Sequence, residues 1–371
     1  MSVKFPDAFV WGTATASYQI EGAFDTDGRG VSIWDTFSKT PGKVVNGDTG
    51  DNACDHYNRF DEDIAIMKDL GVKAYRFSIA WPRLFPQGDS VREERGFDFY
   101  NRLINALIAA DIEPMVTLYH WDLPQTLEDQ GGWANRDIVE KFAHYAQACA
   151  QAFGDRINSW ITLNEPWCVS WLGNSNGAHA PGKKDFFKPG DAELLKVQTD
   201  FLGVNYYSDG FIRSALPEDK PAIEGGFMPF PQRANMAPPA SLANSLTAMG
   251  WVVTPEGLGN LVKKIHRDWP HIPYIVITEN GSSYEDTMVD GQVNDTERTS
   301  YLVRHLQSLQ SAIAEGAPVK GYFAWSLLDN FEWAEGYNKR FGLVHVDYTT
   351  FKRTLKLSGK TYKEIINNNG F

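Results

Sequence analysis

The sequence predicts an α/β fold of the (β/α)8 TIM-barrel type that is incomplete, with about seven of its eight strands recognisable. Segments rich in Val, Ile, Tyr, Phe and Thr alternate with segments whose apolar residues recur at helical spacing, which is typical of parallel α/β architectures. Polar residues stand at the carboxyl ends of many strands, as they do around the single pocket of a barrel. No glycine-rich phosphate loop follows the first strand, so an open doubly wound sheet is disfavoured.

The predicted strands share β-branched and aromatic residues and are bounded by turn residues. They cover 7–16, 74–81, 114–120, 159–165, 200–207, 274–280 and 319–328. Helical patterns with one apolar face lie between most of them, over 59–70, 97–111, 136–153, 255–269 and 296–315. Because no repeat or low-complexity linker interrupts this alternation, we expect a single barrel domain over residues 1–371.

Composition and charge disfavour several classes of partner. Hydrophobic residues make up 43% of the chain and charged residues 22%, which is ordinary for a globular protein with a large core. The formal net charge of −12, without clustered Lys and Arg, disfavours nucleic acids and anionic membranes. The first residues carry no apolar signal segment and no apolar run is long enough to cross a bilayer, so we expect a cytoplasmic protein.

The cysteines and histidines do not predict a metal site. Cys54, Cys149 and Cys168 are odd in number and lack paired spacing, so we expect packing residues and no disulfide framework. His120, in YHWD, has no second His or Cys at ligand spacing, which favours a hydrogen-bonding role. We expect neither a metal nor a cofactor.

Two predicted strands end in a glutamate, in TLNEP and ITENG. Glutamate is a poor strand former and is costly to bury unpaired, so Glu165 and Glu279 serve either in structural ion pairs or in chemistry. Two carboxyls that face each other across a barrel mouth suit hydrolysis of a glycosidic bond. A separation of about 5–5.5 Å would predict retention of anomeric configuration and about 6.5–9.5 Å inversion. The sequence leaves this separation open.

The neighbouring residues assign a role to each carboxyl. Glu165 lies beside Trp167, and apolar bulk there would favour the protonated form that a general acid needs. Glu279 must be ionised to act as a nucleophile, and Arg76 and Tyr207 are the available cation and donor. Arg76 has a second interpretation as a structural ion-pair partner, and the two roles are compatible.

Seven motifs carry a family resemblance. They are FVWGTATASYQIEGA, YRFSIAWPR, TLYHWDLP, TLNEP, DFLGVNYY, ITENG and WSLLDNFEWAEGYNKRFGLVHVDY. Together they resemble the β-glucosidases and β-galactosidases of glycoside hydrolase family 1, which are retaining enzymes on a (β/α)8 barrel. The resemblance implies Glu165 as the acid/base and Glu279 as the nucleophile, in agreement with the assignment from the residues.

The resemblance also implies a subsite for the terminal sugar. Its hydrogen-bonding side chains would be those of Gln19, His120, Asn164, Glu332 and Trp333. Trp325 would form the stacking floor, and Asn164 would bind the 2-hydroxyl. Asn205 is singled out as a supporting residue by the resemblance alone, because a strand-end amide is otherwise unremarkable.

The same resemblance bears on the substrate. A related branch that takes 6-phosphorylated sugars holds the phosphate with a Ser, a Lys and a Tyr, and this chain has Glu332 and Phe341 in place of the Ser and the Tyr. A carboxylate repels a phosphate, so an unphosphorylated hexoside is favoured. The choice between glucoside, galactoside and fucoside stays open.

The chain departs from the family between HAPG and DFLGVNYY. Family members usually carry a fifth strand and its helices there, whereas this chain has only a short segment, which we expect to be an irregular connection over 179–199. Three explanations remain open. In the first, the barrel natively has seven strands, and its open edge is covered by 167–199 or by a second subunit in a homo-oligomer. In the second, the molecule contains residues that this sequence lacks. In the third, the deletion leaves a damaged or repurposed fold.

Three functions therefore compete. The first is a retaining β-glycosidase that hydrolyses terminal β-D-glucosides of disaccharides, short oligosaccharides or aryl aglycones. The second is a catalytically impaired sugar-binding protein on a truncated barrel. The third, an enzyme with an open cleft for polysaccharides, would act on polymers that a pocket excludes.

Overall fold

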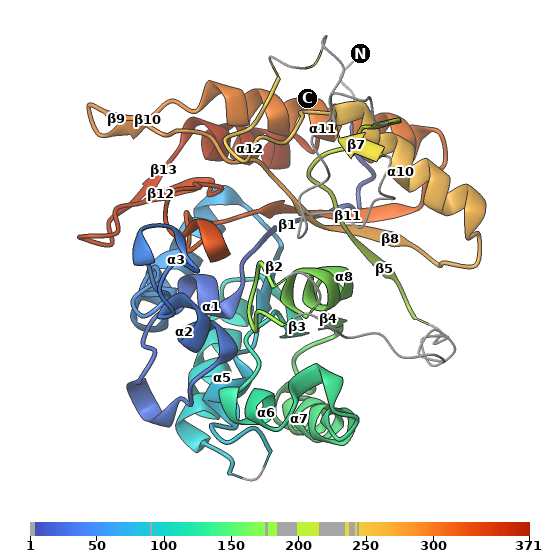
Figure 1. The fold of residues 1–371 in the computed structure, drawn as a ribbon. Coiled ribbons are helices and arrows are strands. Elements are labelled where there is room, and N and C mark those ends of the chain that lie inside the picture. Colours follow the sequence, from blue (N-terminus) through green and yellow to red (C-terminus); the bar gives the residue numbers. More distant parts are fainter. Residues whose placement is uncertain are drawn as a thin grey trace.

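The computed structural model describes residues 4–89, 91–174, 177–183, 199–214, 234–236, 242 and 245–371. Seven parallel strands form one curved sheet in the order β4-β3-β2-β1-β11-β8-β5 (Figure 1). They are β1 (Val10–Ala14), β2 (Ala74–Ser78), β3 (Glu113–Tyr119), β4 (Ser159–Leu163), β5 (Leu202–Asn205), β8 (Ile275–Asn280) and β11 (Val319–Trp325). Each predicted strand is confirmed, and the fold is an incomplete (β/α)8 barrel.

The sheet is open between β4 and β5. Strand β1 pairs with both β2 and β11, which joins the two halves of the chain on that side. Within the described residues, β4 and β5 each pair with one strand only, and Thr162 and Gly203 are exposed on these two strands. The opening therefore lies at the position where the sequence predicted a missing strand.

Helices cover the outside of the sheet in the order of the strands. The predicted helices are confirmed as α3 (His56–Leu70), α5 (Glu94–Ala109), α7 (Ile138–Phe153), α10 (Pro255–Asp268) and α11 (Thr296–Ala314). Helix α10 packs on α11, α11 on the last helix α12 (Leu357–Asn368), α12 on α3, and α3 on α5. The sequence analysis missed α12, whose Tyr362 hydroxyl donates to the Gly12 carbonyl (2.8 Å) and ties the end of the chain to β1.

Short elements connect these strands and helices. The short helices are α1 (Ser17–Ile20), α2 (Ile33–Ser38), α4 (Trp81–Leu84), α6 (Gln125–Asp129) and α8 (Pro166–Cys168). Single helical turns occupy Thr26–Gly28, Val45–Gly47, Gly132–Ala134, Val169–Gly173 and Trp333–Glu335. Antiparallel pairs are formed by β6 (Ile212–Ser214) with β7 (Ala234–Met236), β9 (Met288–Val289) with β10 (Gln292–Val293), and β12 (Val344–Val346) with β13 (Arg353–Leu355).

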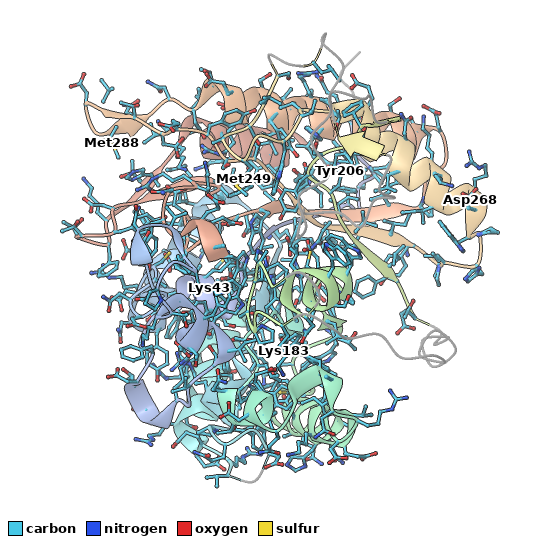
Figure 2. The ribbon with its side chains drawn as sticks, in the orientation of Figure 1. Lys43, Lys183, Tyr206, Met249, Asp268 and Met288 are labelled. Carbon is cyan, nitrogen blue, oxygen red and sulfur yellow. The ribbon has the colours of Figure 1, made fainter. Side chains whose placement is uncertain are left out.

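The connection after β4 is irregular where the structure describes it. Residues 179–183 and Thr199 carry no helix or strand, and the remainder of the predicted connection, 184–198, lies outside the described residues. His179 packs against the rings of Trp34 and Trp121 (centroids 5.5 and 5.4 Å apart). Lys183, labelled in Figure 2, forms an ion pair with Glu128 of α6. No helix in the described part of the chain is long and apolar enough to span a membrane.

A packed interior fills the barrel below the carboxyl ends of its strands. Phe323, from β11, is fully buried and packs with Ala14, Ala74, Met115 and other side chains of the barrel. Its ring lies over Gly12, where an added Cβ would approach the ring carbons to 2.4 Å. Glycine at this position therefore lets the aromatic ring fill the barrel.

We expect Gly12→Ala to destabilise the fold by about 1–3 kcal/mol, because the new methyl group overpacks a filled core. Urea unfolding followed by tryptophan fluorescence measures this change. The double variant Gly12→Ala/Phe323→Leu should lose less stability than the two single losses added together, since the smaller side chain makes room. Full additivity, or wild-type stability in Gly12→Ala, would contradict this account of the core.

Candidate active site

Glu279 stands at the end of β8 with both carboxylate oxygens engaged. The side chain is buried, and Arg76 of β2 forms an ion pair with Oε1. The Tyr207 hydroxyl donates to Oε2 (2.6 Å). Burial raises the Tyr207 pKa well above its ordinary value, so this hydroxyl stays protonated and remains a donor. The cation and the donor that the sequence predicted for Glu279 therefore both contact it.

Burial nevertheless dominates the ionisation of Glu279. Loss of hydration raises its pKa to about 7, although the Arg76 charge and the hydrogen bonds from Tyr207 and Arg76 act in the opposite direction. The negative charge of Glu165 adds to the rise. Glu165 is thus close enough for its charge to act on Glu279, whose pKa of about 7 lies near neutral pH.

Arg76 connects four strands of the barrel. Its guanidinium is buried and donates to the Thr117 hydroxyl of β3 (3.2 Å), the Thr278 carbonyl of β8 (3.2 Å) and the Asn164 amide oxygen after β4 (2.8 Å). A planar fork with five donors suits such divergent acceptors. Both interpretations from the sequence hold, because the same side chain is structural and contacts the candidate nucleophile.

Glu165 follows β4 and begins α8 in a left-handed backbone conformation (φ 43°). Its carboxyl is bound by polar groups. The Asn205 amide donates to Oε1 (2.8 Å), and the Cys168 thiol donates to Oε2 (2.9 Å). Trp167, expected as an apolar neighbour that would enclose this carboxyl, is 38% exposed. The surroundings of Glu165 are thus more polar than the sequence predicted.

Asn205 links the two edges of the open barrel. Besides Glu165, its amide nitrogen donates to the Asn164 side-chain oxygen (3.1 Å) across the gap from β5 to β4. Its own oxygen accepts the Thr278 hydroxyl (2.8 Å), which fixes the orientation of the amide. A residue singled out only by family resemblance therefore holds both Asn164 and Glu165.

His120 and two tryptophans form one side of the site. His120 lies after β3 and stacks on the rings of Trp325 and Trp333 (both centroids 5.8 Å away, interplanar angle 20°). Burial, assisted by the Arg76 charge, lowers the His120 pKa well below its ordinary value, so the ring is neutral. Its Nε2 accepts from the Asn164 amide (3.0 Å), which leaves the proton on Nδ1. That Nδ1 is buried without a partner among the described residues and can bind a ligand hydroxyl.

Gln19 and Glu332 are hydrogen-bonded to each other beside these rings. The Gln19 amide nitrogen donates to the Phe331 carbonyl (2.8 Å) and to Glu332 (3.4 Å), and its buried oxygen has no partner in the described part of the chain. Burial, followed by the charges of Glu279 and Glu165, raises the Glu332 pKa to about 8. The structure thus brings all the sequence-predicted site residues to one end of the barrel.

The sequence analysis missed two side chains of this site. Thr278 precedes Glu279 and was taken as an ordinary strand residue, yet it orients Asn205. Cys168 packs against the core, as predicted for the cysteines, and its thiol also contacts the candidate acid, which the sequence did not predict. No group of three or more His, Cys, Asp or Glu side chains within the described residues is arranged to hold a metal ion.

The sequence profile of glycosyl hydrolase family 1 matches residues 1–192 and 183–371, which together span the chain. The chain belongs to glycosyl hydrolase family 1. It is 42% identical to β-glucosidase A of Thermotoga maritima, over 99% of this chain and 98% of that relative. It is 37% identical to a bifunctional β-D-glucosidase/β-D-fucosidase of Bifidobacterium breve, over 99% of both chains. This family member is a glycoside hydrolase.

A solved structure agrees with this assignment, and the length of a sequence alignment agrees with the gap. The family 1 β-glucosidase from Thermotoga maritima superposes with a TM-score of 0.92 at 41% identity, covering 100% of this chain and 99% of that one. The sequence alignment with its relative from that organism spans 455 positions, whereas this chain has 371 residues, so the relative carries a stretch that this family member lacks. The two profile matches meet at residues 183–192, inside the predicted shortened connection.

We expect Glu332→Gln to stabilise the protein increasingly as pH rises. A carboxyl whose pKa is raised on folding, from 4.5 to about 8, costs no stability below pH 4.5 and progressively more up to pH 8. The amide removes this cost, a gain on the order of 2 kcal/mol at pH 8, reduced because the side chain is partly exposed. Thermal unfolding at pH 5 and pH 8 measures it. Glu335→Gln, on the same turn, is the control, and an equal gain there would contradict the assignment.

Proposed function

We propose that this family 1 enzyme is a retaining β-glycosidase that hydrolyses terminal non-reducing β-D-glucosides by double displacement. One observation carries the proposal: two carboxyls that are joined through the side chains of Arg76, Asn164 and Asn205 have different partners. Glu279 contacts a cation and a phenol, whereas Glu165 contacts an amide and a thiol. Such different surroundings suit a nucleophile and an acid/base in the same site.

In the first step, Glu279 attacks the anomeric carbon and the bond to the aglycone oxygen breaks. Arg76 and Tyr207 stabilise the ionised carboxylate that attacks. Glu165 transfers its proton to the departing oxygen, so the aglycone leaves as a neutral alcohol. The product is a glycosyl ester on Glu279.

In the second step, water replaces the ester. Glu165, now ionised, takes a proton from the water as it attacks the anomeric carbon, and Glu279 leaves as a carboxylate. The Asn205 amide and the Cys168 thiol stabilise the charge that Glu165 carries during this step. Two inversions give net retention of configuration.

The remaining side chains suit recognition of one hexose unit. Gln19 Oε1 and His120 Nδ1 have no partner among the described residues and are available to a sugar hydroxyl. The family resemblance assigns the stacking floor to Trp325 and the 2-hydroxyl to Asn164, which is hydrogen-bonded to Arg76 and Asn205. Solved structures of the Thermotoga maritima β-glucosidase in complex with castanospermine and with noeuromycin support a small sugar-like ligand. The name of the Bifidobacterium breve relative supports β-D-fucosides as further substrates.

Release of nitrophenol from a β-D-glucoside tests the proposal. We expect Glu165→Ala and Glu279→Ala each to lower kcat by at least about 10²-fold, as loss of acid–base or covalent catalysis does. Azide should rescue both variants with opposite stereochemistry. It should give the β-glycosyl azide with Glu165→Ala, where it replaces water, and the α-glycosyl azide with Glu279→Ala, where it replaces the nucleophile.

Other outcomes would support other functions. Glucose binding by a wild type that is as inert as both variants would indicate a sugar-binding protein and overturn the catalytic claim. Proton NMR that shows α-glucose as the first product from a β-glucoside would indicate inversion. Faster release from polysaccharide than from cellobiose would indicate an open cleft.

A further inference from the structure

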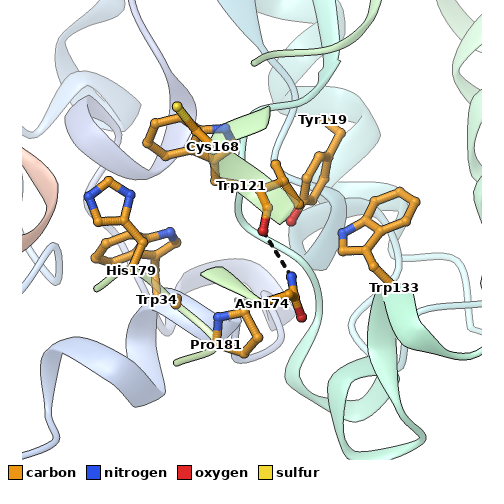
Figure 3. A pocket seen from close by; sticks show the side chains of 10 residues that line it. Trp34, Tyr119, Trp121, Trp133, Cys168, Asn174, His179 and Pro181 are labelled. Atoms are coloured by element: carbon orange, nitrogen blue, oxygen red, sulfur yellow. Dashed lines mark hydrogen bonds between the residues drawn. The ribbon is translucent and has the colours of Figure 1, made fainter. Parts of the chain in front are cut away.

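Cys168 is the one cysteine of this chain whose thiol contacts a candidate catalytic group. It lies three residues after Glu165 on α8, and its Sγ is 2.9 Å from Oε2. The side chain also borders a small cavity whose wall includes the aromatic side chains of Trp34, Tyr119, Trp121 and Trp133 (Figure 3). The amide of Asn174 in that wall is engaged by the Val169 carbonyl (2.9 Å). The hydrogen-bond partner of the thiol is therefore Glu165.

The two oxygens of Glu165 have neighbours of different chemistry. Oε1 accepts from the Asn205 amide nitrogen, which is a donor only. This amide cannot turn to offer its oxygen, because that oxygen accepts the Thr278 hydroxyl. Oε1 is thus held as an acceptor in both protonation states, and a proton placed on it would break this hydrogen bond.

Oε2 contacts the Cys168 thiol, which can adapt its hydrogen bond when the Glu165 carboxyl gains or loses its proton. A thiol is a weak donor and a weak acceptor. It can therefore donate a hydrogen bond to a carboxylate oxygen and release that bond at little cost when the oxygen is protonated. Burial, followed by the Glu165 charge, raises the Cys168 pKa, so the thiol stays protonated beside either form of the carboxyl. It cannot compete with the carboxyl for the catalytic proton.

We propose that Cys168 is a positioning residue for Glu165. Asn205 holds Oε1 as an acceptor, so the proton that is transferred lies on Oε2, beside the Cys168 thiol. The thiol stabilises Oε2 once the carboxyl is ionised. This assignment rests on the proposed function, in which Glu165 is the acid/base. During glycosylation the O–H bond at Oε2 breaks and the proton passes to the aglycone oxygen. During deglycosylation a proton from water returns to Oε2, and the thiol is neither oxidised nor consumed.

The test compares Cys168→Ala and Cys168→Ser with wild type through the pH profile of kcat/KM. On an alkyl β-glucoside, whose leaving group needs a proton, the basic limb follows proton loss from the acid. Alanine removes a donor to the carboxylate, so this limb should move to higher pH, by roughly half a unit. Serine is a stronger donor than a thiol, so the limb should move to lower pH.

Two controls separate this role from a general effect on the fold. With dinitrophenyl β-glucoside, whose leaving group needs no proton, the basic limb should be the same in all three proteins. Cys149→Ala, which removes a buried cysteine from α7, should keep the wild-type profile on both substrates. If wild type hydrolyses neither glucoside, the proposed function fails. If wild type is active and the two Cys168 variants leave the basic limb unmoved, or move it in one direction, the positioning role fails and the function stands.

Discussion

The whole site depends on one buried guanidinium. Arg76 is 1% exposed and contacts β3, the residue after β4, and β8, so it joins strands from both halves of the barrel. Its charge is balanced by Glu279, and a buried pair of this kind is strongly destabilised when one partner is removed. The candidate nucleophile is therefore also part of what holds the strand ends together.

The Asn205 side chain connects β4 and β5, between which the described backbone forms no sheet pairing. Strands β4 and β5 have no mutual pairing, yet Asn205 reaches from one to the other and binds both Asn164 and Glu165. Three hydrogen bonds thus connect the candidate acid Glu165 to Arg76, the ion-pair partner of Glu279. They join Asn205 to Glu165, Asn205 to Asn164, and Arg76 to Asn164. Within the described residues, these contacts connect the two carboxyls across the opening between β4 and β5.

Much of this arrangement could be predicted from the sequence, and the failures have physical reasons. The strands were predictable because each is a short run that contains β-branched or aromatic residues, with polar residues at or just after the ends of most of them. Helix α12 was not, since its inward face consists of few apolar residues spread over twelve positions. Cys168 was missed because the thiol reaches Glu165 only through the left-handed turn at Glu165, which no residue pattern indicates. The sequence pointed to the groups that lower the Glu279 pKa, Arg76 and Tyr207, but not to the burial that raises it, because burial depends on packing from distant segments.

The central claim is that this shortened barrel keeps a working pair of carboxyls. Intact-mass spectrometry after reaction with a 2-deoxy-2-fluoro-β-D-glucosyl fluoride tests it most directly, since that reagent traps the glycosyl ester of a retaining enzyme. The account predicts a protein of 41.7 kDa that gains one fluoroglucosyl group, located on Glu279 by peptide mapping. An unlabelled protein of that mass would contradict it, and labelling confined to a heavier species would show that activity needs residues absent from this chain.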